Sequence, residues 1–271
     1  MSEIDLQEKE TRLLNMLRQL DKPAVAFSGG VDSSLLLAAC ERAGVDAVAL
    51  FADTLVVPAF EKADADRVAG ETGTRLVILP LDPLALPEFT ANVSDRCYYC
   101  KKMIFTALKV KADELGCRCL LDGANVDDMG DYRPGRRATA ELGVLSPLLE
   151  CGFIKADVRA LAAKYNLSVA DKPAYACLAS RIAYGEVITK EKLTMVEQAE
   201  AALRSMGLHD LRVRCHGNLA RIEVNAHQIA DAAGKLRQQI TAAVKNAGFT
   251  YVTLDLEGFR SGSMNDVLKN K

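Results

Sequence analysis

Short apolar runs alternate with amphipathic segments along the first two thirds of the chain. Residues 24–27 form an apolar run that ends at Ser28-Gly29-Gly30, and residues 31–43 then repeat apolar positions at helical spacing. The same order recurs, with strands expected at 47–52, 75–79 and 119–121 and helices at 59–72 and 101–115. Strands that alternate with helices predict an α/β fold, in which helices cover both faces of a parallel sheet.

The pattern changes near residue 189. We expect a helix at 189–206, a hairpin built from 211–215 and 219–224, a helix at 228–247 and a strand at 251–256. A chain of 271 residues, at about 150 residues per domain, also favours one large domain and one smaller one. We therefore predict an α/β domain over residues 1–188 and a smaller C-terminal α+β module over residues 189–271.

Charge and hydropathy narrow the classes of function. The 34 basic and 36 acidic residues give a net charge of −2, without a run of five basic residues, which favours a small-molecule substrate over nucleic acid. The longest apolar stretches, 35–40 and 47–52, are far shorter than the roughly 18 residues that span a bilayer. The acidic N-terminus also lacks the features of a signal peptide, so we expect a cytoplasmic protein.

The segment AVAFSGGVDSSLLL at 24–37 predicts an anion-binding loop. Two glycines after a buried strand allow a sharp turn, and the N-terminus of the next helix attracts negative charge. A Walker-type G-x-x-x-x-G-K-[ST] motif is not present. The alternative, a simple turn between strand and helix, explains the glycines but not the polar residues packed beside them: Ser28, Asp32, Ser33 and Ser34.

A second acidic cluster follows a later strand, in LLDGANVDDMGDYRPG. Asp122-Gly123 ends that strand, at the edge where open α/β sheets bind ligands. Asp127 and Asp128, together with Asp32, are candidates to hold Mg²⁺, and Arg133 is a candidate to contact phosphate. The alternative is a solvated acidic loop.

The eight cysteines do not suggest a disulfide framework, because cytosolic thiols are kept reduced. Cys97 and Cys100 form a C-x₂-C pair, which alone fits half a zinc site, a redox pair or coincidence. With Cys177, three cysteines and an open fourth position fit an iron–sulfur cluster better than a closed zinc site. We expect Cys40, Cys119 and Cys215 in the core, and leave Cys117 and Cys151 unassigned.

SGGVDS resembles the pyrophosphate loop of the ATP pyrophosphatase (PP-loop) superfamily, whose members cleave ATP between the α- and β-phosphates. The resemblance implies a PP-loop, adenine nucleotide alpha hydrolase-like domain that forms AMP and pyrophosphate. It assigns ATP binding to Ser28, Gly29, Gly30, Asp32, Ser33, Ser34, Asp53 and Arg133.

Further motifs resemble the LarE family along nearly the whole chain: RCYYCKK, DGANVDDMGDYRPG, CLASRIAYG, RVRCHGNLARIEV and TLDLEGFRSGSMND. The resemblance implies an ATP-dependent sulfurtransferase that converts pyridinium-3,5-biscarboxylic acid mononucleotide to its thiocarboxylate forms, precursors of the nickel-pincer nucleotide of lactate racemase. It also implies Mg²⁺ and a trimer-based homo-oligomer, such as a hexamer, assembled through the C-terminal module.

The C-x₂-C separates this sequence from family members that have a single sulfur-donating cysteine. Cys97, Cys100 and Cys177 match the three-cysteine members, which hold a 4Fe-4S cluster. Two versions stay open: the cluster carries a hydrosulfide that attacks the substrate, or Cys177 gives up its own sulfur. We favour Cys177 as a ligand.

The remaining site residues also come from the resemblance. Catalytic roles fall on Cys177, Ser180, Arg181, Arg212 and Arg214, substrate contacts on Glu200, Asp231 and Arg260, and divalent-cation contacts on Asp128 and Glu223. Arg212 and Arg214 alternate along one expected strand and should share a face, unless that strand is a solvated surface strand.

Three rival functions remain. A tRNA-thiolating PP-loop enzyme can combine similar cysteines with a cluster, but it needs a basic surface. An amidating synthetase such as NAD or GMP synthetase shares the loop but has no use for the three cysteines. A sensor that binds ATP or an iron–sulfur cluster without catalysis would release no pyrophosphate.

Overall fold

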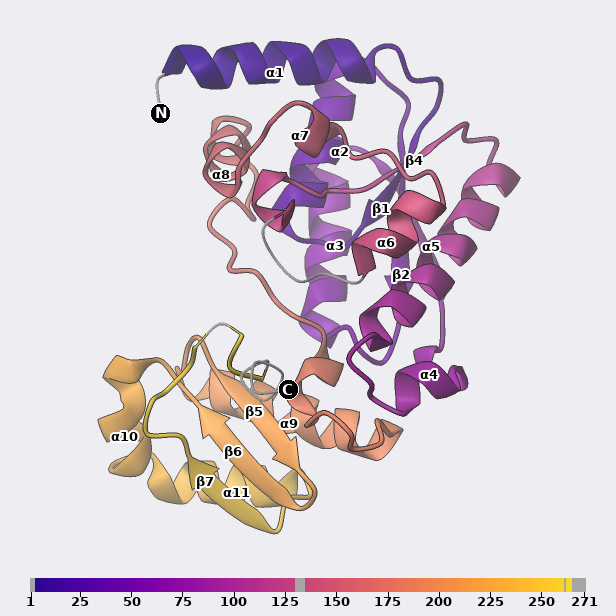
Figure 1. The fold of residues 1–271 in the computed structure, drawn as a ribbon. Helices are drawn as coiled ribbons and strands as arrows, with labels where there is room; N and C mark the ends of the chain where they lie inside the picture. Colours follow the sequence, from indigo (N-terminus) through magenta and orange to yellow (C-terminus); the bar gives the residue numbers. More distant parts are fainter. Residues whose placement is uncertain (1–2, 130–134, 261, 265–271) are drawn as a thin grey trace. The chain divides into compact units, whose positions relative to one another are not determined.

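The computed structural model describes residues 3–129, 135–260 and 262–264 (Figure 1). These residues group into two compact units. The first comprises the described residues of Met1–Pro83 and Cys97–Tyr175, and the second those of Leu84–Arg96 and Ala176–Lys271. The functional division near residue 188 stays a prediction.

A four-stranded parallel sheet forms the centre of the first unit. Its strands, in the order β3-β2-β1-β4, are β3 (Arg75–Pro80), β2 (Val48–Asp53), β1 (Ala24–Phe27) and β4 (Leu120–Leu121). Both neighbours of β1 run parallel to it, with Ala24 opposite Val48 on one side and opposite Leu120 on the other. The parallel sheet and the α/β class predicted from the sequence are confirmed.

Helices cover both faces of this sheet, because alternate residues of β1 and β2 enter two separate apolar clusters. Val25 and Phe27 pack into a cluster with α1, α2 and α8, whereas Ala24 packs with Phe105 and Leu108 of α5. The helices of this unit are α1 (Glu3–Leu17), α2 (Val31–Ala43), α3 (Ala59–Glu71), α5 (Arg96–Glu114), α6 (Gly135–Glu141), α7 (Pro147–Glu150) and α8 (Lys155–Lys164).

Helix α5 begins at Arg96 instead of the expected residue 101. No glycine or proline interrupts the chain from Arg96 to Glu114, so the helix extends through the polar residues that precede its apolar stripe. Cys97 and Cys100 therefore lie in the first turns of a helix and not in the loop before it.

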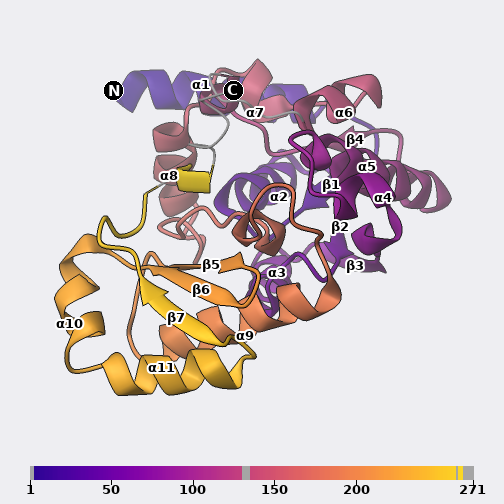
Figure 2. The same ribbon diagram turned by 60° about the horizontal axis from the view of Figure 1, so that its bottom comes forward.

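The second unit contains a mixed sheet with helices packed against it (Figure 2). Strand β5 (Arg212–His216) pairs antiparallel with β6 (Leu219–Glu223), and β6 pairs parallel with β7 (Tyr251–Leu254). Helix α9 contacts β5, and α11 contacts both α9 and β7. The helices are α4 (Pro87–Thr90), α9 (Lys190–Ser205), α10 (Ile229–Ala233) and α11 (Arg237–Asn246).

The α+β character and the hairpin around Gly217 are confirmed, but the single helix expected at 228–247 is wrong. The backbone at Gly234 leaves the helical region, with φ −100° and ψ −99°, and separates α10 from α11. At the other end of the unit, the Thr189 hydroxyl accepts a hydrogen bond from the Lys192 amide, which caps α9 as its sequence suggests.

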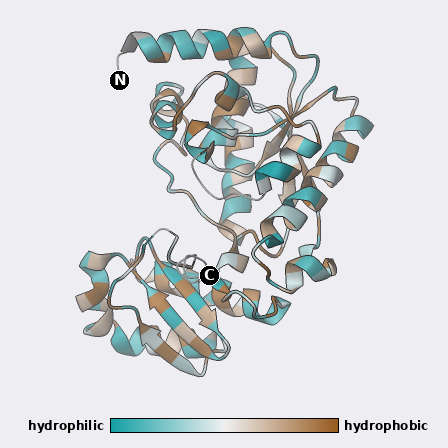
Figure 3. Ribbon diagram, viewed as in Figure 1, coloured by the Kyte–Doolittle hydropathy of each residue, from teal (hydrophilic) through white to brown (hydrophobic). Residues whose placement is uncertain are grey.

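Along most helices, hydrophilic and hydrophobic residues are interspersed (Figure 3). Among the residues described, no helix combines the length and apolarity that crossing a membrane requires.

Candidate active site

The predicted phosphate loop lies between β1 and α2, and its own side chains order it. The Ser34 hydroxyl donates to the Gly30 carbonyl at 2.8 Å, and the Ser33 hydroxyl reaches the same oxygen at 3.2 Å. The Ser28 amide in turn donates to the Ser33 hydroxyl at 3.3 Å. Hydrogen bonds within the loop therefore fix its shape. The loop lies at the N-terminus of a 13-residue helix, a position that attracts anions.

Two glycines are required by close packing around this loop. Gly29 has φ +72°, and a Cβ there would lie 3.0 Å from the carbonyl oxygen of Glu61. Gly123 directly follows Asp122 after β4, and its backbone lies close to the phosphate loop. A Cβ at Gly123 would lie 2.9 Å from the Ser33 amide nitrogen. Neither position accepts a larger residue without displacement of the loop or its neighbours.

Asp32 belongs to a polar cluster at the same edge of the sheet. One carboxylate oxygen accepts a hydrogen bond from the Asn125 side-chain amide at 2.9 Å, and the other pairs with the Lys155 ammonium. The backbone amide of Lys155 also donates to Asp127 at 2.8 Å. Lys155 thus contacts both Asp32, through its ammonium, and Asp127, through its backbone amide, and neither Lys155 nor Asn125 is marked by a sequence motif.

The other acidic candidates are placed less directly. Asp128 accepts a hydrogen bond from the Asn125 amide at 3.0 Å, and Asp122 accepts one from the Ser146 hydroxyl at 2.7 Å. Asp53 ends β2, at the same edge of the parallel sheet as the loop, and forms an ion pair with Lys62. Arg133 lies outside the described residues.

The three cysteines of the predicted cluster are divided between the units. Cys97 is exposed and Cys100 half-buried, and their spacing places them on neighbouring positions of one face of α5. Cys177 is half-buried and directly precedes a short 3₁₀ turn, Leu178–Arg181. Within the part of the chain that the structure describes, no three His, Cys, Asp or Glu side chains form a group able to hold a metal ion.

The remaining cysteines are buried or partly buried free thiols. Burial, helped by nearby Cys119, raises the pKa of Cys40 to about 12, and burial raises the pKa of Cys215 to about 11. Both residues are buried, as predicted, and the raised pKa makes both thiols poor nucleophiles. Cys119 is only half-buried, while the unassigned Cys117 and Cys151 are buried.

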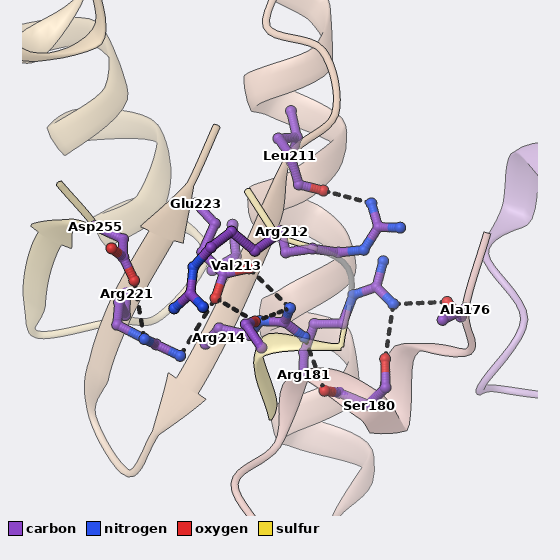
Figure 4. A network of polar contacts seen from close by, with 12 residues as sticks. Ala176, Ser180, Arg181, Leu211, Arg212, Val213, Arg214, Arg221, Glu223 and Asp255 are labelled. Carbon is purple, nitrogen blue, oxygen red and sulfur yellow. Dashed lines mark hydrogen bonds and ion pairs between the residues drawn. The ribbon is translucent and has the colours of Figure 1, made fainter. Parts of the chain in front are cut away.

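In the second unit, Arg181 fixes the backbone around Cys177 (Figure 4). Its side chain is fully buried and forms two hydrogen bonds with Glu200, at 2.8 and 3.1 Å. Its third nitrogen donates to the carbonyls of Ala176, at 2.6 Å, and Cys177, at 3.1 Å. Glu200, predicted to contact substrate, thus serves here as the buried counter-ion of Arg181.

Arg212 and Arg214 lie on one face of β5 and are buried, so the surface-strand alternative is wrong. Arg214 donates to the Ser180 carbonyl at 3.1 Å and to Glu223 at 2.8 Å, while its Nε atom is buried without a partner. Arg212 donates to the Leu211 carbonyl at 2.7 Å and stacks on the Phe259 ring, with its Cζ atom 4.7 Å from the ring centroid.

Comparisons with known proteins identify the family of the chain. No protein-family model matches the chain. The chain is 39% identical over 267 residues to the pyridinium-3,5-bisthiocarboxylic acid mononucleotide synthase of Lactiplantibacillus plantarum. The aligned residues cover 97% of this chain and 96% of that protein. The chain belongs to the LarE-like family of PP-loop sulfurtransferases.

Two further relatives mark how far this similarity extends. An uncharacterized protein of Synechocystis is 41% identical over 265 residues, covering 97% of this chain and 99% of its own. The tRNA-specific 2-thiouridylase MnmA of Xanthobacter autotrophicus is 33% identical over 196 residues, but these cover only 55% of this chain and 48% of that protein. The LarE-like similarity therefore includes both units, whereas the similarity to MnmA is partial.

Some residues predicted from the LarE-like resemblance remain outside the buried network. Asp231, on α10, forms an ion pair with Lys235 at 2.8 Å, and Arg260 forms one with Glu257 at 2.5 Å; both side chains are about half exposed. Glu223 is fully buried between Arg214 and Arg221, whose charges already balance its own. That environment does not favour the predicted cation contact, and the roles of all three residues stay predictions.

Proposed function

We propose that this chain is an ATP-dependent sulfurtransferase that converts pyridinium-3,5-biscarboxylic acid mononucleotide to its thiocarboxylate forms. The observation that carries the proposal is an ordered phosphate loop in a chain that is 39% identical, over 97% of its length, to a synthase named for such a product. The products of ATP cleavage would be AMP and pyrophosphate.

The loop supports the first half-reaction, the activation of a substrate carboxylate. Carboxylate oxygen is a poor leaving group, and attack on the α-phosphorus of ATP converts it into an acyl-adenylate while pyrophosphate departs. Backbone amides of the loop, its serine hydroxyls and the N-terminus of α2 stabilise the charge on that pyrophosphate. Asp32, Asp127 and Asp128 are the proposed contacts of the Mg²⁺ that neutralises phosphate charge, and phosphate oxygens would supply further ligands of that ion.

The second half-reaction forms the carbon–sulfur bond as AMP leaves. Arg212 and Arg214 supply positive charge for an anionic mononucleotide, and Ser180 connects Arg214 to the turn that follows Cys177. Arg181 holds the carbonyl groups of Ala176 and Cys177, which flank the Cα atom of Cys177, and so positions the backbone that carries the thiol.

We propose Cys97, Cys100 and Cys177 as the three protein ligands of a 4Fe-4S cluster. All three side chains have some exposure, unlike fully buried Cys215, and thiolates are the usual ligands of such clusters. When bound, a cluster with three thiolate ligands offers one iron position to an exchangeable sulfur ligand, which allows repeated turnover. In the alternative version, Cys177 donates its own sulfur and becomes dehydroalanine.

Anaerobic purification followed by iron and sulfide analysis separates these two versions. We expect about four irons per chain, the content of one 4Fe-4S cluster, and loss of iron in Cys97→Ala but not in Cys119→Ser, the half-buried control. Absence of iron, together with loss of one H₂S from Cys177 after reaction, would establish the sacrificial version instead.

The activity itself is tested with the wild-type protein, ATP, Mg²⁺, sulfide and the bis-carboxylate mononucleotide. Formation of AMP, pyrophosphate and a product heavier by one oxygen-to-sulfur exchange supports the proposal. Pyrophosphate release without sulfur incorporation would reject sulfur transfer, and no pyrophosphate release would favour a sensor.

The partial match to a tRNA thiolase supports one second candidate, tRNA thiolation. A net charge of −2 makes it the weaker one, because tRNA binding requires a basic surface. Retention of tRNA at physiological salt would favour it over the mononucleotide reaction.

We also propose a trimer-based homo-oligomer, including a hexameric form, assembled through the C-terminal module. Light scattering that gives the mass of a monomer at micromolar concentration would reject this assembly.

A further inference from the structure

Lys172 lies in the segment between α8 and Cys177, and its side chain is only 13% exposed. Its ammonium contacts three acceptors: the carbonyl oxygen of Gly29 at 3.1 Å, Glu61 at 2.6 Å and Asp64 at 2.7 Å. A lysine ammonium has three N–H donors, so these contacts use all of them. Lys172 therefore cannot bind a phosphate directly without giving up a contact that it already has.

The contact with Gly29 determines how the phosphate loop presents its next amide. The Gly29 carbonyl and the Gly30 N–H belong to one trans peptide, and the two groups point in opposite directions. Because Lys172 holds the carbonyl, the Gly30 N–H is turned to the other side, where the Ser28 hydroxyl lies at 3.4 Å. The Ser28 hydroxyl is itself 3.3 Å from the Ser33 hydroxyl. The Gly30 N–H therefore lies on the same side of the loop as these two hydroxyls.

Helix α3 contacts both Lys172 and Gly29. It supplies both carboxylates that bind Lys172, and its backbone packs against Gly29, where a Cβ would lie 3.2 Å from the Ala65 nitrogen. The Lys172 ammonium also faces the Phe60 ring, 5.9 Å from its centroid. Lys172 thus ties the glycine turn of the loop to the start of α3.

The surrounding charges argue against Lys172 as a free cation that attracts pyrophosphate. Burial raises the pKa of Glu61, and Lys172 counteracts that rise. Burial acts on Asp64 in the same direction, but hydrogen bonds from Lys172 and Arg67 prevail and lower its pKa. The single charge of Lys172 therefore already has two carboxylate partners.

We propose that Lys172 is a positioning residue for pyrophosphate: it holds the Gly29 carbonyl so that the Gly30 amide faces the departing anion. The inference rests on the proposed function, which assigns pyrophosphate to this loop, and adds a residue that lies 143 positions from Gly29 in the sequence.

The test measures binding of inorganic pyrophosphate, with Mg²⁺, to the full-length protein by calorimetry. Lys172→Met should weaken binding roughly 10- to 100-fold, the range for loss of one hydrogen bond to a charged group. Lys164→Met is the matched control, because Lys164 is half exposed, pairs with Glu10 and does not contact the loop. Its pyrophosphate affinity should equal that of the wild type.

A second variant separates loop geometry from general stability. Lys172→Met removes the cation that pairs with buried Glu61, whereas Lys172→Met combined with Glu61→Gln also removes the charge of Glu61. The double variant should recover the melting temperature of the wild type and still bind pyrophosphate weakly. Recovery of both stability and affinity, or unchanged affinity in Lys172→Met, would overturn the positioning role alone. If the wild-type protein itself bound no pyrophosphate, the proposed function would fall together with this inference.

Discussion

The phosphate loop and the arginine network around Cys177 handle charge in opposite ways. The loop is made of neutral donors, backbone amides and serine hydroxyls, arranged at a helix N-terminus. The network consists of buried ions, with Arg181 paired to Glu200 and Arg214 paired to Glu223. An arriving anion therefore meets neutral dipoles at the loop, but ions that already have partners in the network.

This difference changes the role we assign to Arg181. Its charge is matched by Glu200, and another of its nitrogens donates to the carbonyls of Ala176 and Cys177 and to the Ser180 hydroxyl. Such an arginine positions the cysteine more than it binds substrate. Arg214, whose Nε atom is buried without a partner, keeps capacity for one more hydrogen bond.

The largest effect should come from breaking the balanced pair. Arg181→Ala leaves the fully buried Glu200 without its main cation, and we expect a loss of about 3–5 kcal/mol in the free energy of unfolding. Urea denaturation measures it. The control is Arg204→Met, which removes a more exposed partner of the same carboxylate at 3.4 Å and should cost at most about 1 kcal/mol. Equal losses of unfolding free energy in the two variants would contradict the view that Arg181 is the main counter-ion of Glu200.

In the phosphate loop, we expect ATP binding to depend on the backbone conformation. Gly29→Ala combines a left-handed backbone, φ +72°, with a clash against α3, and should weaken ATP binding by about tenfold or more, corresponding to roughly 1–3 kcal/mol of strain. Gly44→Ala has nearly the same φ, +73°, but open space around it. The control should lose some stability while ATP titrations stay unchanged. If both variants lost ATP affinity equally, backbone strain alone would explain the effect.

A change in the network should separate sulfur transfer from ATP binding. Arg214→Ala removes the guanidinium that joins Ser180 to Glu223, while Glu223 keeps Arg221 at 3.3 Å. We expect roughly a 10- to 100-fold loss in the rate of thiolated product formation, with the dissociation constant for ATP unchanged. Parallel loss of both quantities would count against a role confined to the second half-reaction.

The smallest effect concerns thiol labelling. Exposed Cys97 should react with iodoacetamide at pH 8 in the apoprotein, whereas Cys40 and Cys215 should not, because burial holds their pKa values at about 12 and about 11. Both should react at the ordinary rate once the protein is unfolded in urea, since the cause of the shift is then gone. Peptide mass spectrometry identifies each site, and early labelling of Cys40 in the folded protein would show that its surroundings open.

Local patterns were predictable from the sequence, and long-range pairings were not. The phosphate loop could be identified because its glycines and serines are contiguous, and the limits of β1 and α2 follow from a simple change in apolar spacing. No such pattern links Lys172 to Gly29, or Arg181 to Glu200, because each pair meets only after folding. The same holds for Asn125 and Lys155 beside Asp32, whose spacing along the chain carries no motif.

Other differences have local causes that the periodic pattern concealed. The apolar spacing of residues 228–247 continues across Gly234, but that residue adopts a backbone conformation that ends α10. Helix α5 begins in residues whose polarity conceals their helical state. The burial of Arg212 and Arg214 was also concealed, because charged residues on a strand ordinarily indicate solvent.

Because Gly123 lies so close to the phosphate loop, we expect Gly123→Ala to separate the use of ATP from the other functions of the protein in a cell. Its backbone has no left-handed strain, so the effect of alanine there comes only from its methyl group, which would lie 2.9 Å from the Ser33 nitrogen. A cell that carries Gly123→Ala would make a full-length protein with its arginine network intact and its nucleotide loop obstructed. Phenotypes that survive this allele would depend on the presence of the protein, and those that vanish would depend on its use of ATP.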